Sequence, residues 1–211
     1  MPVRSDRLPT RYVRRPGELW ALGLGALVLA ACMVVVRNGE VGGIEGSIFE
    51  AVNGLPDVLR APMWVFQIFG SLAFVALVAL GVLMLRRWRL GFALVAAIPL
   101  KLACEWWVVK ALVERERPAF TVADAIIRDV NTSPLGFPSG HAVFAFALAG
   151  LLAPYLRRRG VMVVYGLAVA NSVARVYLGA HNPLDVVAGA GLGIAIAAAL
   201  NLTIGVPDTG E

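Results

Sequence analysis

The two histidines of the chain, His141 and His181, are the residues best suited to chemistry, and each lies where an apolar segment meets a loop. An imidazole is the side chain whose unperturbed pKa lies nearest neutrality, so it can carry a proton or act as a nucleophile. Because most of the chain is apolar, the polar chemistry must be confined to the edges of the apolar segments.

The stretch from Arg175 to Asp185 contains the candidate nucleophile, His181. Gly179 is typical of a helix end, and Asn182 followed by proline is typical of the start of the next helix. Asp185 then lies within reach of His181, and a carboxylate on one imidazole nitrogen fixes the tautomer and raises the basicity of the other. Asp185 could also form a capping pair with Asn182, and the two roles are compatible.

A second group of candidates is the sequence Pro138-Ser139-Gly140-His141, which directly precedes an apolar segment. Ser139 is a good N-cap residue, and the free amides at a helix start bind anions. Gly140 lets a ligand approach the backbone closely, and His141 could protonate a leaving group. The alternative is a capped helix with an incidental histidine.

A third group consists of cations at the end of another apolar segment. Lys110 and Arg117 are seven residues apart, so a helix would place them on one face, and Pro118 ends that helix. Two cations on one face suit a phosphate group. The alternative is that they reach toward the membrane interface and pair with Glu114 and Glu116.

Composition indicates the elements that must position these residues. The 211 residues are 59% hydrophobic and 16% charged, with a mean hydropathy of +0.76, whereas a soluble domain carries about 25% charge. Six apolar segments are roughly as long as a membrane-spanning helix requires, and they comprise residues 19–36, 63–85, 90–109, 141–156, 161–178 and 184–204. We therefore predict an all-α bundle of six transmembrane helices, although the two shortest segments could be buried core helices.

Charge placement predicts the orientation. Arginines cluster at 4–15, 86–89 and 157–159, whereas the other long loops carry mixed charge. The positive-inside rule places both termini in the cytoplasm and the loops 37–61, 112–138 and 179–183 together on the outer face. The rule also accounts for the net charge of +5 without nucleic-acid binding. We expect a cytoplasmic tail at 1–18, a transmembrane domain at 19–204 and a second cytoplasmic tail at 205–211.

Smaller features carry further expectations. The apolar residues of loop 37–61 recur at helical spacing, which predicts a short amphipathic helix on the membrane face. Cys32 and Cys104 lie in apolar segments, which favours buried packing over a disulfide. The residues before Cys32 also resemble a lipoprotein cleavage site, although the apolar run continues beyond it.

The three motifs together resemble the type 2 phosphatidic acid phosphatase family, whose superfamily includes the vanadium haloperoxidases. The family pattern is Lys-x6-Arg-Pro, then Pro-Ser-Gly-His, then Ser-Arg-x5-His-x3-Asp. This chain matches it in order and spacing from Lys110 to Asp185. The one departure is Ala174 in place of the usual serine, which removes a hydroxyl group but leaves the main roles intact.

The resemblance implies a role for each matched residue. His181 would attack phosphorus and form a phosphohistidine, Asp185 would orient it, and His141 would protonate the leaving oxygen and then help to activate water. The remaining residues would hold the phosphoryl oxygens and stabilise the transition state, and they are Lys110, Arg117, Ser139, Gly140 and Arg175. No metal ion or other cofactor is implied.

Two features lie outside the family pattern. Lys101 and Glu105 stand one helical turn apart inside an apolar segment, where ions usually pair and face protein. We predict an ion pair against another helix or at a subunit contact, with Lys101 roughly on the opposite face from Lys110. Gly189-x3-Gly193 predicts close helix packing.

The sequence therefore predicts a multi-pass lipid phosphatase of a bacterial inner membrane with its site on the outer face. The expected substrate is a lipid-linked phosphate or pyrophosphate, with a polyprenyl pyrophosphate favoured, then phosphatidylglycerol phosphate, and phosphatidic acid also open. A lipid phosphotransferase using the same site and a non-enzymatic lipid transporter are the alternatives, and a haloperoxidase fits less well because those proteins are soluble. A homo-oligomer is left open.

Overall fold

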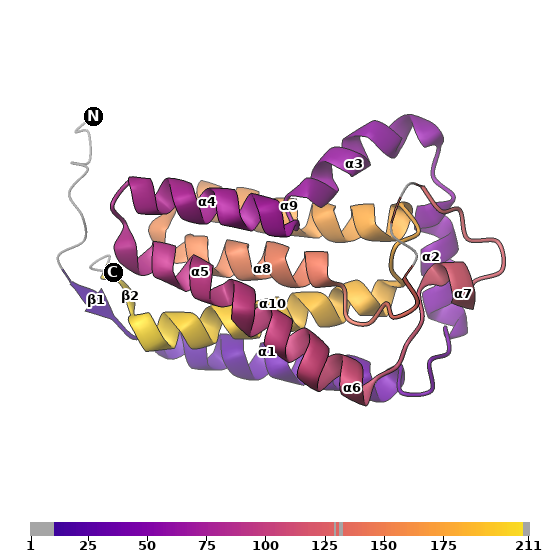
Figure 1. Cartoon of the computed structure of the whole chain (residues 1–211), viewed down its shortest axis with the longest axis horizontal. Helices are drawn as coiled ribbons and strands as arrows, with labels where there is room; N and C mark the ends of the chain where they lie inside the picture. Colours follow the sequence, from indigo (N-terminus) through magenta and orange to yellow (C-terminus); the bar gives the residue numbers. More distant parts are fainter. Residues whose placement is uncertain (1–10, 129, 131–132, 209–211) are drawn as a thin grey trace.

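The computed structural model of the protein describes residues 11–128, 130 and 133–208, except for the side chains of residues 106–108 and 110. The chain is mostly helical, as predicted (Figure 1). Its elements are β1 (Tyr12–Val13), α1 (Pro16–Val35), α2 (Gly43–Asn53), η1 (Asp57–Leu59), α3 (Arg60–Ile68), α4 (Leu72–Met84), α5 (Trp88–Ala103), the π-helical η2 (Cys104–Val109), α6 (Lys110–Leu112), α7 (Pro118–Thr121), α8 (Gly140–Leu152), η3 (Ala153–Tyr155), α9 (Arg158–Tyr177), α10 (Pro183–Ile204) and β2 (Val206–Pro207).

Helices α8 and α10 form the centre of the bundle, and α1, α4, α5 and α9 surround them (Figure 1). Small residues allow the central helices to approach closely. A Cβ atom at Gly193 would lie 2.5 Å from the carbonyl oxygen of Val143 in α8, and one at Gly191 would lie 2.8 Å from that of Gly25 in α1. The close packing predicted from Gly189-x3-Gly193 is therefore confirmed, because two faces of α10 need glycine to fit.

Helix length and composition alone do not confirm the predicted count of six membrane spans. Among the described residues, α1, α9 and α10 are long and apolar enough to cross a bilayer, and the pair α3–α4 would make a fourth span if counted as one. The predicted helix at 63–85 is broken between α3 and α4, with a bend of 49°. The break has a local cause, because Ser71 caps α4 by accepting a hydrogen bond from Phe74 N at 3.1 Å.

The two remaining apolar segments form shorter helices. The segment predicted at 90–109 forms α5 and then widens into the π-helical turns of Cys104–Val109, and the segment predicted at 141–156 forms α8 followed by η3. Six complete spans therefore remain a proposal. The outer surface nevertheless suits lipid, since large apolar side chains such as Trp20, Leu27 and Leu77 are 81%, 65% and 65% exposed.

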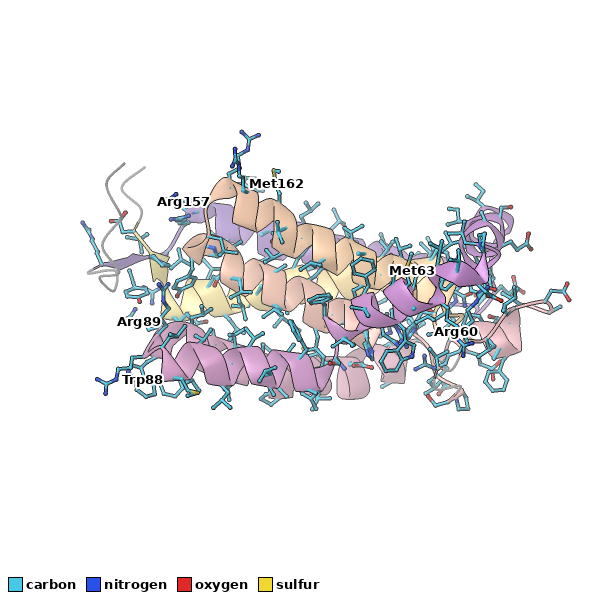
Figure 2. The ribbon with its side chains drawn as sticks, turned by 90° about the horizontal axis from the view of Figure 1, so that it is seen from above. Arg60, Met63, Trp88, Arg89, Arg157 and Met162 are labelled. Atoms are coloured by element: carbon cyan, nitrogen blue, oxygen red, sulfur yellow. The ribbon has the colours of Figure 1, made fainter. Side chains whose placement is uncertain are left out.

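The two ends of the described chain meet at one end of the bundle. Strands β1 and β2 pair antiparallel, with Tyr12 opposite Pro207. Arg89 and Arg157 lie at this same end, whereas Arg60 lies toward the other (Figure 2). Arg14 and Arg89 donate to the carbonyl oxygens of Leu202 and Ile204, which are exposed acceptors at the end of α10. Helix α1 begins at Pro16, inside the stretch predicted as a tail.

The amphipathic helix predicted in loop 37–61 is present as α2, and its inward face is partly polar. Glu45, Phe49 and Asn53 are buried at successive turns, whereas Ile44 and Ile48 are 83% and 49% exposed. The predicted apolar stripe therefore faces outward in part. The inward face is partly polar because Glu45 and Asn53 bind other segments of the chain. Asn53 donates to the carbonyl oxygens of Ile126 and Tyr177 at 2.9 Å, and the partners of Glu45 are described below.

Candidate active site

A short ladder of backbone hydrogen bonds joins the segment that contains Arg117 to the segment that leads into Pro138-Ser139-Gly140-His141. Arg117 N donates to Pro134 O at 3.0 Å, Gly136 N donates to Arg115 O at 2.8 Å, and Glu116 forms an antiparallel bridge with Leu135. This ladder holds the arginine segment beside the residues that precede Pro-Ser-Gly-His. Gly136 fits tightly, because a Cβ atom there would lie 3.0 Å from Cγ of Arg117.

A second backbone contact joins the Pro-Ser-Gly-His turn to the stretch from Arg175 to Asp185. Ser139 N donates to Asp185 O at 2.9 Å, and the Ser139 hydroxyl group accepts from Ala142 N at 3.5 Å as the N-cap of α8. A Cβ atom at Gly189 would lie 2.6 Å from Ser139 O, so α8 and α10 meet at this turn. Ser139 is therefore the N-cap that the sequence predicted, and it is fully buried.

The end of α9 and the start of α10 hold the stretch from Arg175 to Asp185 in a fixed geometry. Ala180 N donates to Arg175 O and Gly179 N donates to Val176 O, which is the Schellman arrangement of a helix end. Gly179 has φ +74°, and a Cβ atom there would lie 2.5 Å from Ile126 O. The helix terminator predicted at Gly179 is therefore confirmed, and its glycine is required by both conformation and space.

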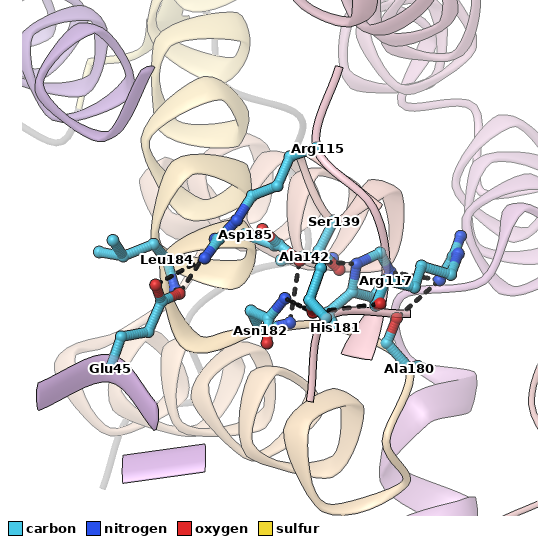
Figure 3. A network of polar contacts seen from close by, with 11 residues as sticks. Glu45, Arg115, Arg117, Ser139, Ala142, Ala180, His181, Asn182, Leu184 and Asp185 are labelled. Atoms are coloured by element: carbon cyan, nitrogen blue, oxygen red, sulfur yellow. Dashed lines mark hydrogen bonds and ion pairs between the residues drawn. The ribbon is translucent and has the colours of Figure 1, made fainter. Parts of the chain in front are cut away.

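His181 lies between an arginine and a carboxylate (Figure 3). Nη1 of Arg117 is 3.2 Å from Nε2 of His181 and 2.8 Å from Ala180 O. Because arginine is always a donor, Nε2 must accept, and the neutral ring then carries its proton on Nδ1. Nδ1 faces Asp185, whose Oδ2 atom is 3.6 Å away, an ion-pair distance rather than a short hydrogen bond. This tautomer leaves the lone pair on Nε2.

Asp185 is held by more than the histidine. Its Oδ2 atom accepts from Asn182 N at 2.9 Å, which is the capping contact predicted as an alternative role. Its Oδ1 atom accepts from Nη1 of Arg115 at 2.9 Å, and both residues are fully buried. The capping role and the approach to His181 therefore coexist, as the sequence allowed.

Arg115 is the main residue that the sequence analysis missed. Its guanidinium group binds Glu45 of α2 through two hydrogen bonds of 3.0 and 2.6 Å, in addition to Asp185. Burial alone would lower the pKa of Arg115, but the hydrogen bonds and charges of Glu45 and Asp185 raise it overall. Glu45 also accepts from Leu184 N at 2.9 Å. Only the position of Arg115 between two motif residues could have suggested this role.

Arg117 and Arg175 carry buried donors that are not used within the described part of the chain. Nε of Arg117 and Nε of Arg175 are both buried and make no hydrogen bond to the residues that the structure describes. Burial lowers the pKa of Arg117, and the carboxylates of Asp185 and Glu105 oppose that shift. Nη1 of Arg175 donates to Oε1 of Gln67 in α3, a second residue that the sequence analysis did not single out.

His141 lies in the first turn of α8, close enough to His181 and Arg175 to interact with both electrostatically. A Cβ atom at Gly70, in the break between α3 and α4, would overlap the His141 carbonyl group. Of the predicted residues, the structure gathers His141, His181, Asp185, Arg117 and Arg175, together with the turn formed by residues 139 and 140. Lys110 begins α6, but its side chain lies outside the described part. Ala174 is fully buried beside Arg175.

One protein-family model matches the part of the chain that carries the motifs. The model of the PAP2 superfamily matches residues 86–205, more than half of the chain. This range contains all three motifs. The chain therefore belongs to the PAP2 superfamily, which confirms the family resemblance predicted from the motifs.

Individual relatives are similar over different shares of the chain. The lipid A 4'-phosphatase of Bacteroides thetaiotaomicron is 36% identical over half of this chain, which spans only 52% of that protein. The decaprenylphosphoryl-5-phosphoribose phosphatase of Mycolicibacterium smegmatis is 35% identical over 66% of this chain and 75% of the relative. The crystal structure of a transmembrane PAP2-type phosphatidylglycerolphosphate phosphatase from Bacillus subtilis superposes with a TM-score of 0.67 at 21% identity, covering 87% of this chain and 94% of that one.

Proposed function

We propose that this chain is an integral membrane lipid phosphatase that hydrolyses a lipid-linked phosphate or pyrophosphate through a phosphohistidine on His181. One observation carries the proposal. Nε2 of His181 faces the partly buried Arg117, while Nδ1 faces the Asp185 carboxylate at 3.6 Å. A histidine oriented in this way, beside cations, is suited to attack a phosphoryl group.

The arginines supply the electrostatic part of the mechanism. The Nε groups of Arg117 and Arg175 are buried donors without a partner among the described residues, and buried donors normally have one. Phosphoryl oxygens would satisfy these donors and exchange the Arg117–His181 contact for an Arg117–phosphate contact. Lys110 would add a further positive charge, and the amides at the start of α8 would bind the same anion.

In the first step, the Nε2 lone pair forms a bond to phosphorus while the bond from phosphorus to the leaving oxygen breaks in line. His141 donates a proton to that oxygen, so the lipid leaves as an alcohol or a lipid monophosphate. In the second step, His141 takes a proton from water, and the water oxygen displaces Nε2 from phosphorus. Inorganic phosphate is released and both histidines return to their initial states. No metal ion takes part in these steps.

A lipid is the substrate class that the surroundings of the site favour. An apolar cavity of about 120 Å³ lies between α4, α8 and α9, and its lining includes Phe69 and Ala145. Ala145 is one helical turn from His141, and Phe69 precedes the Gly70 that contacts the His141 carbonyl. Among lipids we favour a polyprenyl-linked phosphate or pyrophosphate, because the relative of which this chain covers three quarters acts, by its name, on a decaprenyl-linked phosphate.

We further propose that the chain lies in a bacterial inner membrane, with both termini in the cytoplasm and the site on the outer face. The candidate spans, and the arginines gathered at the end where the termini meet, support this orientation.

The experiment that tests the proposal measures phosphate release from a panel of lipid phosphates in detergent, with a chelator present. The panel contains a polyprenyl pyrophosphate, phosphatidylglycerol phosphate and phosphatidic acid. We expect release that the chelator does not diminish and that His181→Ala abolishes while lipid binding persists. Lipid binding with no release from any substrate would contradict the phosphatase and favour a lipid transporter.

A further inference from the structure

A buried ion pair lies behind the Ser139–Gly140 turn at the start of α8 and has no part in the mechanism above. Lys101, in the last turn of α5, pairs with Glu105, in the first turn of the π-helical η2. The two residues are only 7% and 5% exposed. Charged groups so deeply buried in an apolar bundle are costly unless they are paired, and they are rarely present without a role.

The pair contacts the first residue of α8 directly. A Cβ atom at Gly140 would lie 2.6 Å from Nζ of Lys101 and 3.0 Å from Oε2 of Glu105. Nζ of Lys101 also lies 4.7 Å from the centre of the Phe144 ring, one turn further along α8. The ion pair expected against another helix is therefore present, and the helix it contacts is the one that begins with Ser-Gly-His. Gly140 is required because the two charged groups fill the space of a side chain.

Each member of the pair interacts with a different residue of the candidate active site. The charge of Glu105 acts on Arg117, and the charge of Lys101 acts on His141. A carboxylate near the start of a helix is favoured by the helix dipole and occupies the kind of place that an anionic ligand takes. A bound phosphate would therefore be repelled by Glu105 and attracted by Lys101.

We propose that Lys101 and Glu105 are positioning residues that set the affinity of the phosphate site for anions by balancing each other's charge. Glu105 supports Arg117 and the start of α8 but opposes the binding of phosphate, and Lys101 offsets that opposition. This inference rests on the proposed function only in so far as both place phosphate at Arg117 and the first turn of α8.

The proposal predicts that the two single variants change the affinity for phosphate in opposite directions. Glu105→Gln removes the negative charge and leaves Lys101 uncompensated, so phosphate should bind more tightly. Lys101→Met leaves the carboxylate uncompensated beside Arg117, so phosphate should bind more weakly. The double variant Lys101→Met/Glu105→Gln should return toward the original affinity. A pair that serves only for packing would weaken binding in both single variants, because either loss disturbs the same contact with Gly140.

The experiment measures the dissociation constant of inorganic phosphate by calorimetry on the detergent-purified full chain, so that it does not depend on turnover. We expect a change of about tenfold in opposite directions for the two single variants, because a unit charge at several ångströms in partly buried surroundings acts at about that level. The control is Glu18→Gln, which alters a half-buried carboxylate in the first turn of α1 that accepts from Asn201 near the end of α10. The control should leave phosphate affinity unchanged.

Changes in the same direction for both single variants, or no change in either, would overturn the proposal. Thermal unfolding of each variant identifies a failure to fold, and if Lys101→Met does not fold, Glu105→Gln alone decides: tighter binding supports the proposal and weaker or equal binding contradicts it. The outcome is separable from that of the proposed function. If the chain hydrolyses lipid phosphates but the two variants do not change phosphate affinity in opposite directions, the proposed function stands and this inference fails. If the affinities change in opposite directions but no lipid phosphate is hydrolysed, this inference stands and the proposed function fails.

Discussion

At the scale of single residues, Asp185 is the side chain on which the most contacts converge. Its two oxygens accept from Arg115 and from the Asn182 amide, and one of them faces His181. Because the carboxylate is fixed on both sides, the histidine ring is oriented by a group that cannot rotate. Arg115 thereby links α2, through Glu45, to the candidate nucleophile.

We expect Arg115→Met to be strongly destabilising, because it leaves the carboxylates of Glu45 and Asp185 buried without their cation. Removal of one partner from a buried ion pair costs about 3–5 kcal/mol. Thermal unfolding in detergent measures the effect, and any folded fraction should also hydrolyse substrate more slowly because Asp185 is no longer fixed. The double variant Arg115→Met/Glu45→Gln should recover part of the lost stability. Unchanged stability and activity in Arg115→Met would contradict the role given to this arginine.

The sequence singled out residues that the structure brings together, but it did not indicate the contacts that hold them. His141, His181 and Asp185 were predicted because their types and spacing match a chemical requirement. Arg115, Glu45 and Gln67 were missed because their partners are distant in sequence, and no periodicity marks a residue that binds across 70 positions, as Arg115 binds Glu45. Side-chain pairing of this kind becomes visible only when the helices are placed in space.

At the scale of elements, apolar length predicted where helices occur but not where they break. The segment at 63–85 is largely apolar, yet it breaks near Gly70, where Ser71 caps α4 and the His141 carbonyl of α8 lies close against the glycine. The segment at 90–109 widens into π-helical turns around Glu105. Both irregularities adjoin the candidate active site, which is where local preferences most often give way to function.

The close contact between α8 and α10 gives a prediction about Gly189. We expect Gly189→Ala to lower stability by about 1–3 kcal/mol, as overpacking does, since its methyl group would lie 2.6 Å from Ser139 O and 2.9 Å from Cβ of Ala142. The displaced Ser139 turn should also reduce turnover. Thermal unfolding and phosphate release measure the two effects.

A matched control is Gly81→Ala in α4, where a Cβ atom would meet nothing within 4 Å. That variant should keep full turnover and be neutral or more stable by up to about 1 kcal/mol, because alanine is the better helix former. Equal behaviour of the two variants would show that the α8–α10 contact does not position the site.

At the scale of the whole molecule, the bundle has two chemically different ends. The termini and the arginines that bind the last carbonyls of α10 lie at one end, and α2, α7 and the candidate active site lie at the other (Figures 1 and 2). Charge placement along the sequence predicted this polarity, because arginine clusters and motif loops alternate between successive apolar segments. The sequence could not predict that β1 and β2 would join the two ends of the described chain.

The orientation of the bundle in the membrane can be tested with single cysteines introduced at exposed positions into a chain whose own cysteines are replaced by serine. We expect Asp124→Cys to react with a membrane-impermeant maleimide on intact cells, and Arg158→Cys to react only after permeabilisation. Phosphate release by each variant verifies that it is folded. The reverse pattern of labelling would place the candidate active site in the cytoplasm.

The proposed phosphohistidine on His181 is tested most directly by trapping the phosphorylated enzyme. We expect a rapid quench with a lipid phosphate substrate, followed by mass spectrometry of peptides, to locate a phosphoryl group on His181. The group should be absent in His181→Ala, and in His141→Ala it should both form and disappear more slowly, because His141 serves both steps. Phosphate release that persists in His181→Ala, or a phosphoryl group found on another residue, would contradict the claim that His181 is the nucleophile.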